Sequence, residues 1–292
     1  MKIFKKNNTH IGLASFYEIK TPAVRAFYIF CIVCLIITAL ICILPPLWIL
    51  LSGFKEGKEF YSIPPTILPE TFDFGKLVST WKMLHFERYY LNTLVLAFGC
   101  IVFKIVFCGL AGYVMSMLKP RGIGLIERIL IITMMIPANV KLATTYQNIV
   151  DFNMLNSYTG LWCMAATDTF MILVFKSFFE GIPFSMVEAA RIDGSGELST
   201  LFRIILPNCK PVIATSIILT INASWNDFFW PYLIVKDKNL FTVMLQVYTI
   251  KTSTSIDVVM ISLIFVIIPP ILLFVVFQKF IMQGFTMSGV KG

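Results

Sequence analysis

The chain has 292 residues, of which 58% are hydrophobic and only 14% are charged, and its formal net charge is +8. Soluble domains carry about 25% charged residues, so a mean hydropathy of +0.82 excludes an ordinary water-soluble fold. The basic residues are dispersed rather than gathered in one arm or face, which argues against nucleic-acid binding. Several apolar runs reach the ~20 residues needed to cross ~30 Å of hydrocarbon. We therefore expect an all-α polytopic membrane protein.

Six transmembrane helices are predicted along the chain. They are expected at residues 27–51, 91–117, 126–149, 158–179, 212–232 and 258–280. The first run is longer than the 7–15 apolar residues of a signal peptide and lacks a cleavage site, so we interpret it as an uncleaved anchor. The third and fourth runs are the least uniformly apolar, because Lys141, Gln147 and Asp168 interrupt them.

Lysine and arginine residues predict the orientation of these spans. With the N-terminus inside, one side of the membrane collects the positive charges of the N-terminal tail (1–26), the loop at 180–211 and the C-terminal tail (281–292). The outer loop at 52–90 also carries lysines, but nearby acidic residues balance them. The positive-inside rule therefore predicts a multi-pass membrane protein with both termini in the cytoplasm.

The loop at residues 180–211 is long and charged for a connection between helices, which commonly takes 2–8 residues. Val187 and Ala190 recur at helical spacing with their apolar neighbours, which predicts a short amphipathic helix. Gly194 is expected to end that helix, because glycine adopts the left-handed conformation without a Cβ penalty.

A second short helix is predicted directly after this turn. Ser195 is expected to cap it. Its apolar stripe is formed by Leu198, Leu201, Phe202 and Ile205, and Pro207 and Pro211 are expected to mark the return to the membrane. Apolar side chains outside the bilayer need cover, so they either contact a partner protein or lie among the lipid headgroups. The sequence favours contact with a partner protein over a position among the lipid headgroups.

Seven residues of this loop form a pattern of fixed spacing: Glu188, Ala189, Ala190, Asp193, Gly194, Phe202 and Pro207. The pattern resembles the EAA signature of ABC importer permeases. The resemblance implies that these residues, together with Leu198, form coupling helices that dock into a groove of a cytoplasmic ATPase.

Two further stretches resemble one branch of this family. The segment Trp225–Pro231 is similar to a Trp-Asn-acid-Phe-x-Trp-Pro stretch of MalG-like carbohydrate permeases, and the tail around Gly284–Thr286 is similar to theirs. The resemblance covers residues 89–292. It implies the type I ABC importer permease (MetI-like) fold, with its transmembrane domain at 89–280.

Polar and aromatic residues cluster toward the outer end of the fifth span: Asn222, Ser224, Trp225, Asn226 and Asp227. They are candidates for a sugar path, because aromatic faces and polar groups suit a pyranose, but an interfacial belt explains them equally well. Lys104, Lys141 and Asp168 also lie within predicted spans. For these three, pairing inside the bundle or snorkelling is favoured over a direct functional role.

No enzymatic motif is present. The sequence lacks the phosphate-binding Gly-x-x-x-x-Gly-Lys-Ser/Thr loop, a Gly-x-Ser-x-Gly elbow and a His-Glu-x-x-His helix. We therefore expect no catalytic residue, no metal site and no cofactor in this chain. The resemblance implies that partner subunits bind ATP and magnesium.

The resemblance therefore implies a permease subunit of a bacterial cell membrane, which forms half of the path of an ATP-driven carbohydrate importer. The resemblance implies a heterodimer with a second permease, two cytoplasmic ATPases and an extracytoplasmic solute-binding protein. Two alternatives stay open. The first is an ABC importer for another solute, such as a peptide or a phosphorylated polyol, and the second is a membrane protein that works without ATP.

Overall fold

The computed structural model describes residues 22–64 and 66–288. Within those residues the fold is helical and contains no strand, so the prediction of an all-α protein is confirmed. Most of the expected N-terminal tail, residues 1–21, and the end of the expected C-terminal tail, residues 289–292, lie outside the described residues.

Three helical segments are long and apolar enough to cross a membrane. They are α1 (Pro22–Ser52), α15 (Ile256–Ser288), and α3 (Phe86–Phe103), which continues through a π-helical turn η3 (Lys104–Cys108), α4 (Gly109–Tyr113) and a second π-helical turn η4 (Val114–Leu118). Proline pairs lie inside α1 and α15, where neighbouring groups in a bundle can satisfy the freed carbonyls.

Three more spans are possible only if each of three bent helix pairs counts as one, which would give six in the described part of the chain. The pairs are α5 (Ile123–Met135) with α6 (Ala138–Asp151), bent by 107°; α7 (Thr159–Ala166) with α8 (Thr169–Glu180), bent by 44°; and residues 197–208 with α12 (Lys210–Asn226), bent by 84°. The six-span topology stays a prediction. Five of its ranges fall on these segments, whereas the fifth, 212–232, extends beyond α12 into residues 229–232.

The third range, 126–149, differs most from a straight span. Ile136 and Pro137 are both extended, with ψ angles of 119° and 141°. Proline lacks a backbone N–H and disfavours a helical conformation in the residue before it, so α5 ends at Met135. The range is two helices at nearly a right angle.

The core of the bundle lies where α3 and α4 pack against α7, α8 and α12. Small residues allow close contact: a Cβ atom added to Gly112 would lie 2.8 Å from Cβ of Phe175 and 2.9 Å from the backbone nitrogen of Lys176. Close approach of helix backbones at small residues is how membrane helices gain packing energy.

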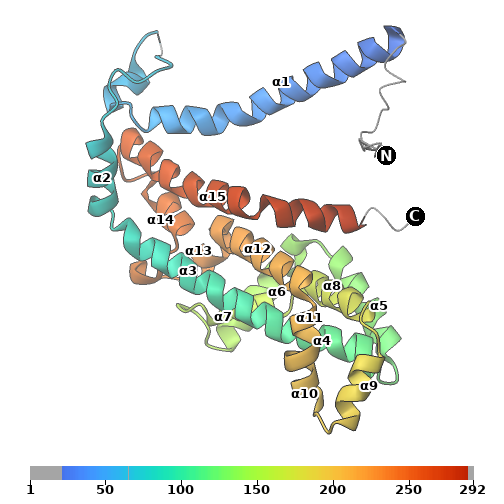
Figure 1. Cartoon of the computed structure of the whole chain (residues 1–292). Helices are drawn as coiled ribbons and strands as arrows, with labels where there is room; N and C mark the ends of the chain where they lie inside the picture. The colour runs from blue at the N-terminus through green and yellow to red at the C-terminus, as the bar shows by residue number, and fades with distance from the viewer. Residues whose placement is uncertain (1–21, 65, 289–292) are drawn as a thin grey trace, which may run out of the picture.

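Shorter elements cover the end of the bundle at the left of Figure 1, where α2 and the preceding loop lie. They are η2 (Gly57–Tyr61), α2 (Phe74–Met83), α13 (Phe229–Ile234), η6 (Lys238–Leu240) and α14 (Val243–Ile250). The Lys76–Asp257 ion pair, 3.0 Å between Nζ and Oδ2, links α2 to the first turn of α15. The buried Lys55 donates from Nζ to the backbone oxygen of Thr66.

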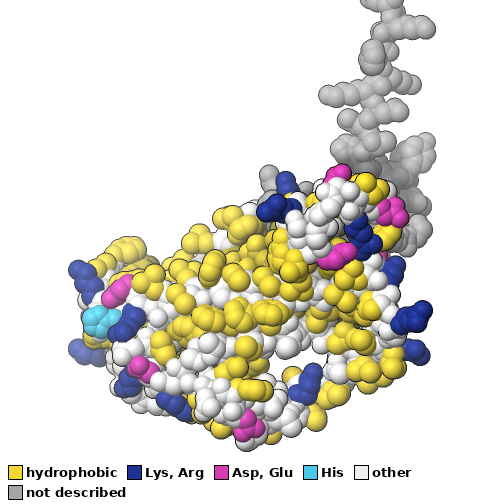
Figure 2. All heavy atoms as spheres, turned by 90° about the horizontal axis from the view of Figure 1, so that it is seen from below, with side chains coloured by type: hydrophobic (Ala, Val, Ile, Leu, Met, Phe, Trp, Pro, Cys, Tyr) yellow, Lys and Arg dark blue, Asp and Glu magenta, His cyan; other side chains and the backbone are white. Residues whose placement is uncertain are grey.

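The exterior of the helices is apolar. Leucine, isoleucine and phenylalanine side chains of α1 are exposed along most of its length, and Figure 1 shows α1 diverging from α15 toward its N-terminal end. Figure 2 shows hydrophobic side chains across the middle of the lower face, with many lysine and arginine side chains toward its two ends. Such an exterior is suited to a bilayer core.

Candidate functional site

The loop at 180–211 begins with α9 (Ser185–Ile192), which ends in a Schellman motif. Gly194 has φ of +77°, its N–H donates to the oxygen of Arg191 at 3.0 Å, and Ser195 N–H donates to that of Ala190 at 2.9 Å. These are the two bonds that define the motif. The predicted left-handed stop at Gly194 is confirmed.

The predicted cap at Ser195 is wrong. Gly196 is the N-cap of α10 (Glu197–Thr200) and makes no side-chain cap bond. The Ser195 backbone is used in the Schellman motif, and its Oγ accepts from Oγ1 of Thr200 at 3.3 Å. The sequence missed this because both roles are compatible with serine after a glycine.

The second helix is also longer than predicted. After α10 the chain continues through a π-helical turn, η5 (Leu201–Ile205), into α11 (Leu206–Asn208). Pro207 is the second residue of α11. The chain turns back into the bundle at Cys209, with φ −104° and ψ 35°, which lies between Pro207 and Pro211, the two prolines expected to mark the return.

Glu197 holds the two helices together. Its carboxylate accepts from the Tyr113 hydroxyl at 2.6 Å and from Nε of Arg191 at 2.9 Å. Tyr113 belongs to α4 and Arg191 belongs to α9. The Glu197 side chain therefore links α10 to α4 of the bundle and to α9 of the loop. The hydrogen bond from Tyr113, followed by that from Arg191, lowers the pKa of Glu197 below its ordinary value.

The apolar side chains of the loop divide into two groups. The buried group is Val187, Ala190, Leu201 and Ile205, and the exposed group is Phe184, Ile192, Leu198 and Phe202. In the buried group, Val187, Leu201 and Ile205 share one core cluster with Phe175 and Phe179 of α8. Ile192 is 86% exposed and Leu198 is 63% exposed. Glu188, Ala189 and Asp193 are exposed beside them.

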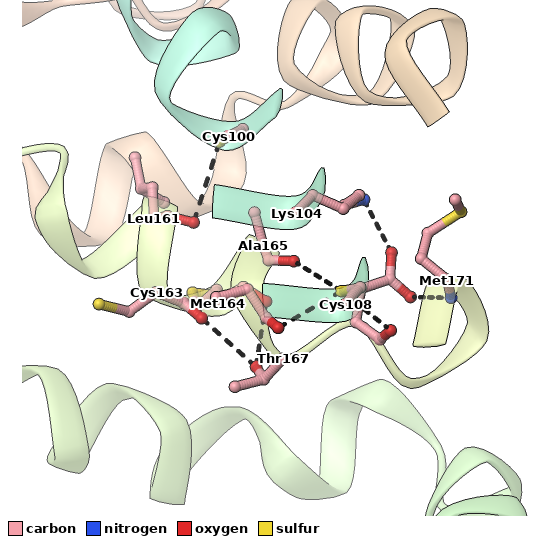
Figure 3. Close-up of polar contacts among 11 residues, drawn as sticks. Cys100, Lys104, Cys108, Leu161, Cys163, Met164, Ala165, Thr167 and Met171 are labelled. Carbon is pink, nitrogen blue, oxygen red and sulfur yellow. Dashed lines mark hydrogen bonds and ion pairs between the residues drawn. The ribbon is translucent and has the colours of Figure 1, made fainter. Parts of the chain in front are cut away.

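A second polar site lies inside the bundle, where Nζ of Lys104 is 2.7 Å from Oδ2 of Asp168. Asp168 also caps α8, because its Oδ1 accepts from the backbone N–H of Met171 at 3.2 Å (Figure 3). The predicted pairing within the bundle is confirmed for these two residues. Lys141 instead is exposed and donates to the oxygen of Thr133 at 3.2 Å, across the bend between α5 and α6.

The bend between α7 and α8 frees backbone carbonyls beside this ion pair. Cys108 Sγ lies 3.8 Å from the oxygen of Ala165, 3.4 Å from that of Ala166 and 3.6 Å from that of Asp168. Figure 3 shows Cys108 and Lys104 on the same side of the bend. The π-helical turn η3 supplies both residues, and π-helical turns occur frequently at functional sites.

A cavity of about 280 Å³ opens beside the ion pair. Its polar lining comes from α3, η3 and α12, from the residue before α8 and from the residue after α12: Cys100, Lys104, Asp168, Thr220, Ser224 and Asp227. Thr220, Ser224 and Asp227 are spaced by four and then three residues, so α12 and its C-terminal end present them on one face. That spacing is a signal the sequence interpretation missed.

The structure places the residues of the predicted path in different surroundings, and of these only Ser224 and Asp227 line the cavity. Asp227 lines the cavity, and its Oδ1 accepts from the backbone N–H of Trp230 at 3.2 Å. Trp225 is buried and donates from Nε1 to the oxygen of Val266 at 3.0 Å, so it packs α12 against α15. Asn222 and Asn226 are exposed and bonded to each other, with Nδ2 of Asn226 3.1 Å from Oδ1 of Asn222.

Comparison with known families agrees with this architecture. Residues 105–286 match the family described as the binding-protein-dependent transport system inner membrane component. The chain belongs to this family. Family membership makes it a transport permease of the inner membrane.

The individual relatives are also named as permeases of transport systems. The chain is 28% identical over 262 residues to the arabinooligosaccharides transport system permease protein AraQ of Bacillus subtilis, across 87% of this chain and 92% of the relative. It is 28% identical over 270 residues to the sn-glycerol-3-phosphate transport system permease protein UgpE of Yersinia enterocolitica, across 89% and 96%.

A solved structure confirms the predicted fold. The crystal structure of a bacterial ABC transporter involved in the import of the acidic polysaccharide alginate contains a chain that superposes with a TM-score of 0.77. The two chains are 27% identical, and the match covers 91% of this chain and 99% of that one. The chain therefore has the type I ABC importer permease (MetI-like) fold and is an ABC importer permease.

Proposed function

We propose that this chain is one of two membrane-spanning subunits of a carbohydrate importer, and that ATPase subunits drive it through the loop at 180–211. The observation that carries the proposal is the division of the loop's apolar side chains. Val187 and Leu201 are fully buried against the bundle, whereas Ile192 and Leu198 are largely exposed. Large apolar side chains exposed beside charged residues on two neighbouring short helices are typical of a protein contact.

The loop is built to transmit force. Its buried half packs on α8, and Glu197 bonds to Tyr113 of α4. A displacement of the exposed half therefore moves α8 and α4, because a rigid contact connects the loop to each of them. Shifting an equilibrium from 1:99 to 99:1 takes about 5.5 kcal/mol of differential binding, which a docked, packed helix pair can deliver from ATPases that bind ATP and magnesium.

Three features support a carbohydrate as the solute. The names of the relatives refer to arabinooligosaccharides, to sn-glycerol-3-phosphate and to alginate. The Trp225–Pro231 segment resembles that of carbohydrate permeases. An intramembrane cavity here is lined by carboxylates and hydroxyls, which are groups that bind sugar hydroxyls. A phosphorylated polyol is the second candidate, because one relative is named for such a solute.

The proposal includes an orientation and a set of partners. In Figure 1 the beginning of α1 and the end of α15 lie at the right, as α9 does, and the loop before α2 lies at the left. This arrangement supports a cytoplasmic location for both described ends and the α9–α10 loop. The opposite end would face the solute-binding protein, and a second permease would complete the path.

Copurification tests the coupling part of the proposal. The double change Leu198→Asp with Phe202→Asp places charges on the exposed surface of the loop, and it should abolish copurification of the ATPase subunits while the permease still accumulates. The matched control is Ile63→Asp, which alters a 97% exposed apolar residue at the opposite end. Normal ATPase capture by the double variant would overturn the proposed role of the loop.

A further inference from the structure

The charges around the cavity are unevenly balanced. Lys104 is paired with Asp168, whereas within the described residues no cation pairs with Asp227. Asp227 accepts from the backbone N–H of Trp230. With one lysine and two aspartates, the cavity carries no net charge when Asp227 is protonated and one negative charge when it is ionised. In neither state is it positive.

Thr220 gives independent evidence of a ligand. Its side chain is 2% exposed, it lines the cavity, and its Oγ1 has no hydrogen-bond partner among the described residues. A buried hydroxyl without a partner costs about 1–3 kcal/mol. A hydroxyl can both donate and accept, so Thr220 is satisfied by any ligand that carries hydroxyl groups.

The charged side chains of the cavity also have hydrogen-bond donors and acceptors that are not used within the chain. The Lys104 ammonium has three donors, of which the contact with Asp168 uses one. Each carboxylate oxygen can accept more than one bond, so Asp168 and Asp227 still have free acceptor sites. At about 30 Å³ of liquid volume per water, the cavity of about 280 Å³ holds roughly nine waters or, in their place, one small polyhydroxylated ring.

We propose that this cavity is a subsite for one uncharged sugar unit of the transported carbohydrate, and that it disfavours phosphate and carboxylate groups. Sugar hydroxyls donate to Asp168 and Asp227 and accept from Lys104, while Thr220 bonds to a further hydroxyl. An anionic solute would meet two carboxylates and a lysine that is already paired, in surroundings of low dielectric where like charges repel strongly.

The inference rests on the proposed function and restricts the range of solutes that the importer accepts. Among solutes of the kinds for which the relatives are named, it selects neutral oligosaccharides over sn-glycerol-3-phosphate and over acidic polysaccharides. It also changes the sequence-based path: of the residues expected there, Ser224 and Asp227 line the cavity, whereas Asn222, Trp225 and Asn226 do not.

Uptake into proteoliposomes that contain the whole transporter and its own solute-binding protein tests the subsite. The variants are Thr220→Val and Asp227→Asn. The matched control is Ser216→Ala, which removes another buried hydroxyl without a partner, one turn earlier on α12 and outside the cavity lining. The solutes are labelled neutral arabino- and malto-oligosaccharides, sn-glycerol-3-phosphate and oligoalginate.

We expect uptake of a neutral oligosaccharide by the wild type, and none of the two anions. Thr220→Val and Asp227→Asn should each lower that uptake about tenfold, the equivalent of about 1.4 kcal/mol, with normal assembly and normal ATPase activity. Ser216→Ala should match the wild type. Unaltered uptake by both cavity variants would overturn the subsite and leave a cavity that holds water only.

The other outcomes separate the two proposals. If the wild type imports sn-glycerol-3-phosphate or oligoalginate, the exclusion of anions is wrong while the carbohydrate-related importer stands. If an assembled transporter with active ATPases imports none of the solutes, the proposed carbohydrate function itself is overturned. Loss of assembly in Thr220→Val would contradict the claim that its hydroxyl makes no contact within the chain.

Discussion

The loop at 180–211 and the cavity beside Lys104 depart from ordinary residue placement in opposite ways. In the loop, apolar side chains such as Leu198 are exposed at one end of the bundle. In the cavity, charged and hydroxyl groups lie between helices that are apolar enough to cross a membrane. Each placement is unfavourable unless something else contacts those groups. The difference indicates a macromolecular partner for the loop and a small hydroxylated solute for the cavity.

The largest expected effect comes from a change on the buried side of the loop. Leu201 is fully buried in the core cluster with Phe175, so Leu201→Asp should prevent accumulation of the folded permease, because an unpaired charge would lie in the core. Leu198→Asp should accumulate normally. Membrane yield and gel filtration in detergent measure both, and equal yields for the two variants would contradict the division of the loop.

The division could be predicted only in part from the sequence. The positions of the EAA pattern are close together along the chain, and helical spacing indicated the two helices. It did not distinguish Leu198 from Leu201, because both belong to one apolar stripe. Only the packing of Leu201 and Ile205 against α8 separates the residues that face the bundle from those that face a partner.

The next effect concerns the ion pair in the cavity. Removing one partner of a buried pair typically costs about 3–5 kcal/mol; because the Asp168 side chain is 30% exposed, Lys104→Met should cost about 2 kcal/mol. Lys104→Met combined with Asp168→Asn removes the unpaired charge and should recover part of the loss. Thermal unfolding of the purified permease checks this, and an unstable double variant beside a stable single one would contradict it.

The cavity was harder to predict than the loop, for a physical reason. Lys104, Asp168 and Thr220 are far apart in the sequence, and the bend after α7 brings the first two together. Hydropathy averages over a window and does not detect bends, so 126–149 and 158–179 were expected as straight spans. The pairing of Lys104 with Asp168 was nevertheless predictable, because an isolated charge is costly among apolar helices.

A smaller effect is expected at the turn between α9 and α10. Gly194 has φ of +77° and no atom within 4 Å of an added Cβ, so Gly194→Ser should cost about 1 kcal/mol through backbone strain alone. Gly196 has φ of −71°, and Gly196→Ser should be neutral. ATPase affinity and unfolding temperature of the two variants test this, and equal values would show that the turn conformation is unimportant.

The smallest effect is a pH dependence at Glu197. Its folded pKa is lowered by Tyr113 and Arg191 from an ordinary value of 4.5, so its stabilisation is fully present above that value and is lost as pH falls through the folded pKa. Unfolding temperatures of the wild type and Glu197→Gln should differ by a constant amount from pH 8 to pH 6 and converge in acid. A difference that grows toward acid would contradict this assignment.

The contact between the loop and an ATPase is the central claim, and site-specific photo-cross-linking in native membranes tests it most directly. A photoreactive residue replaces Leu198 in one variant and Ile63 in another, both in the assembled transporter. The account predicts cross-links from position 198 to the ATPase subunit and none from position 63. Cross-links from position 198 to lipid alone would instead place the loop among the headgroups and contradict the coupling role.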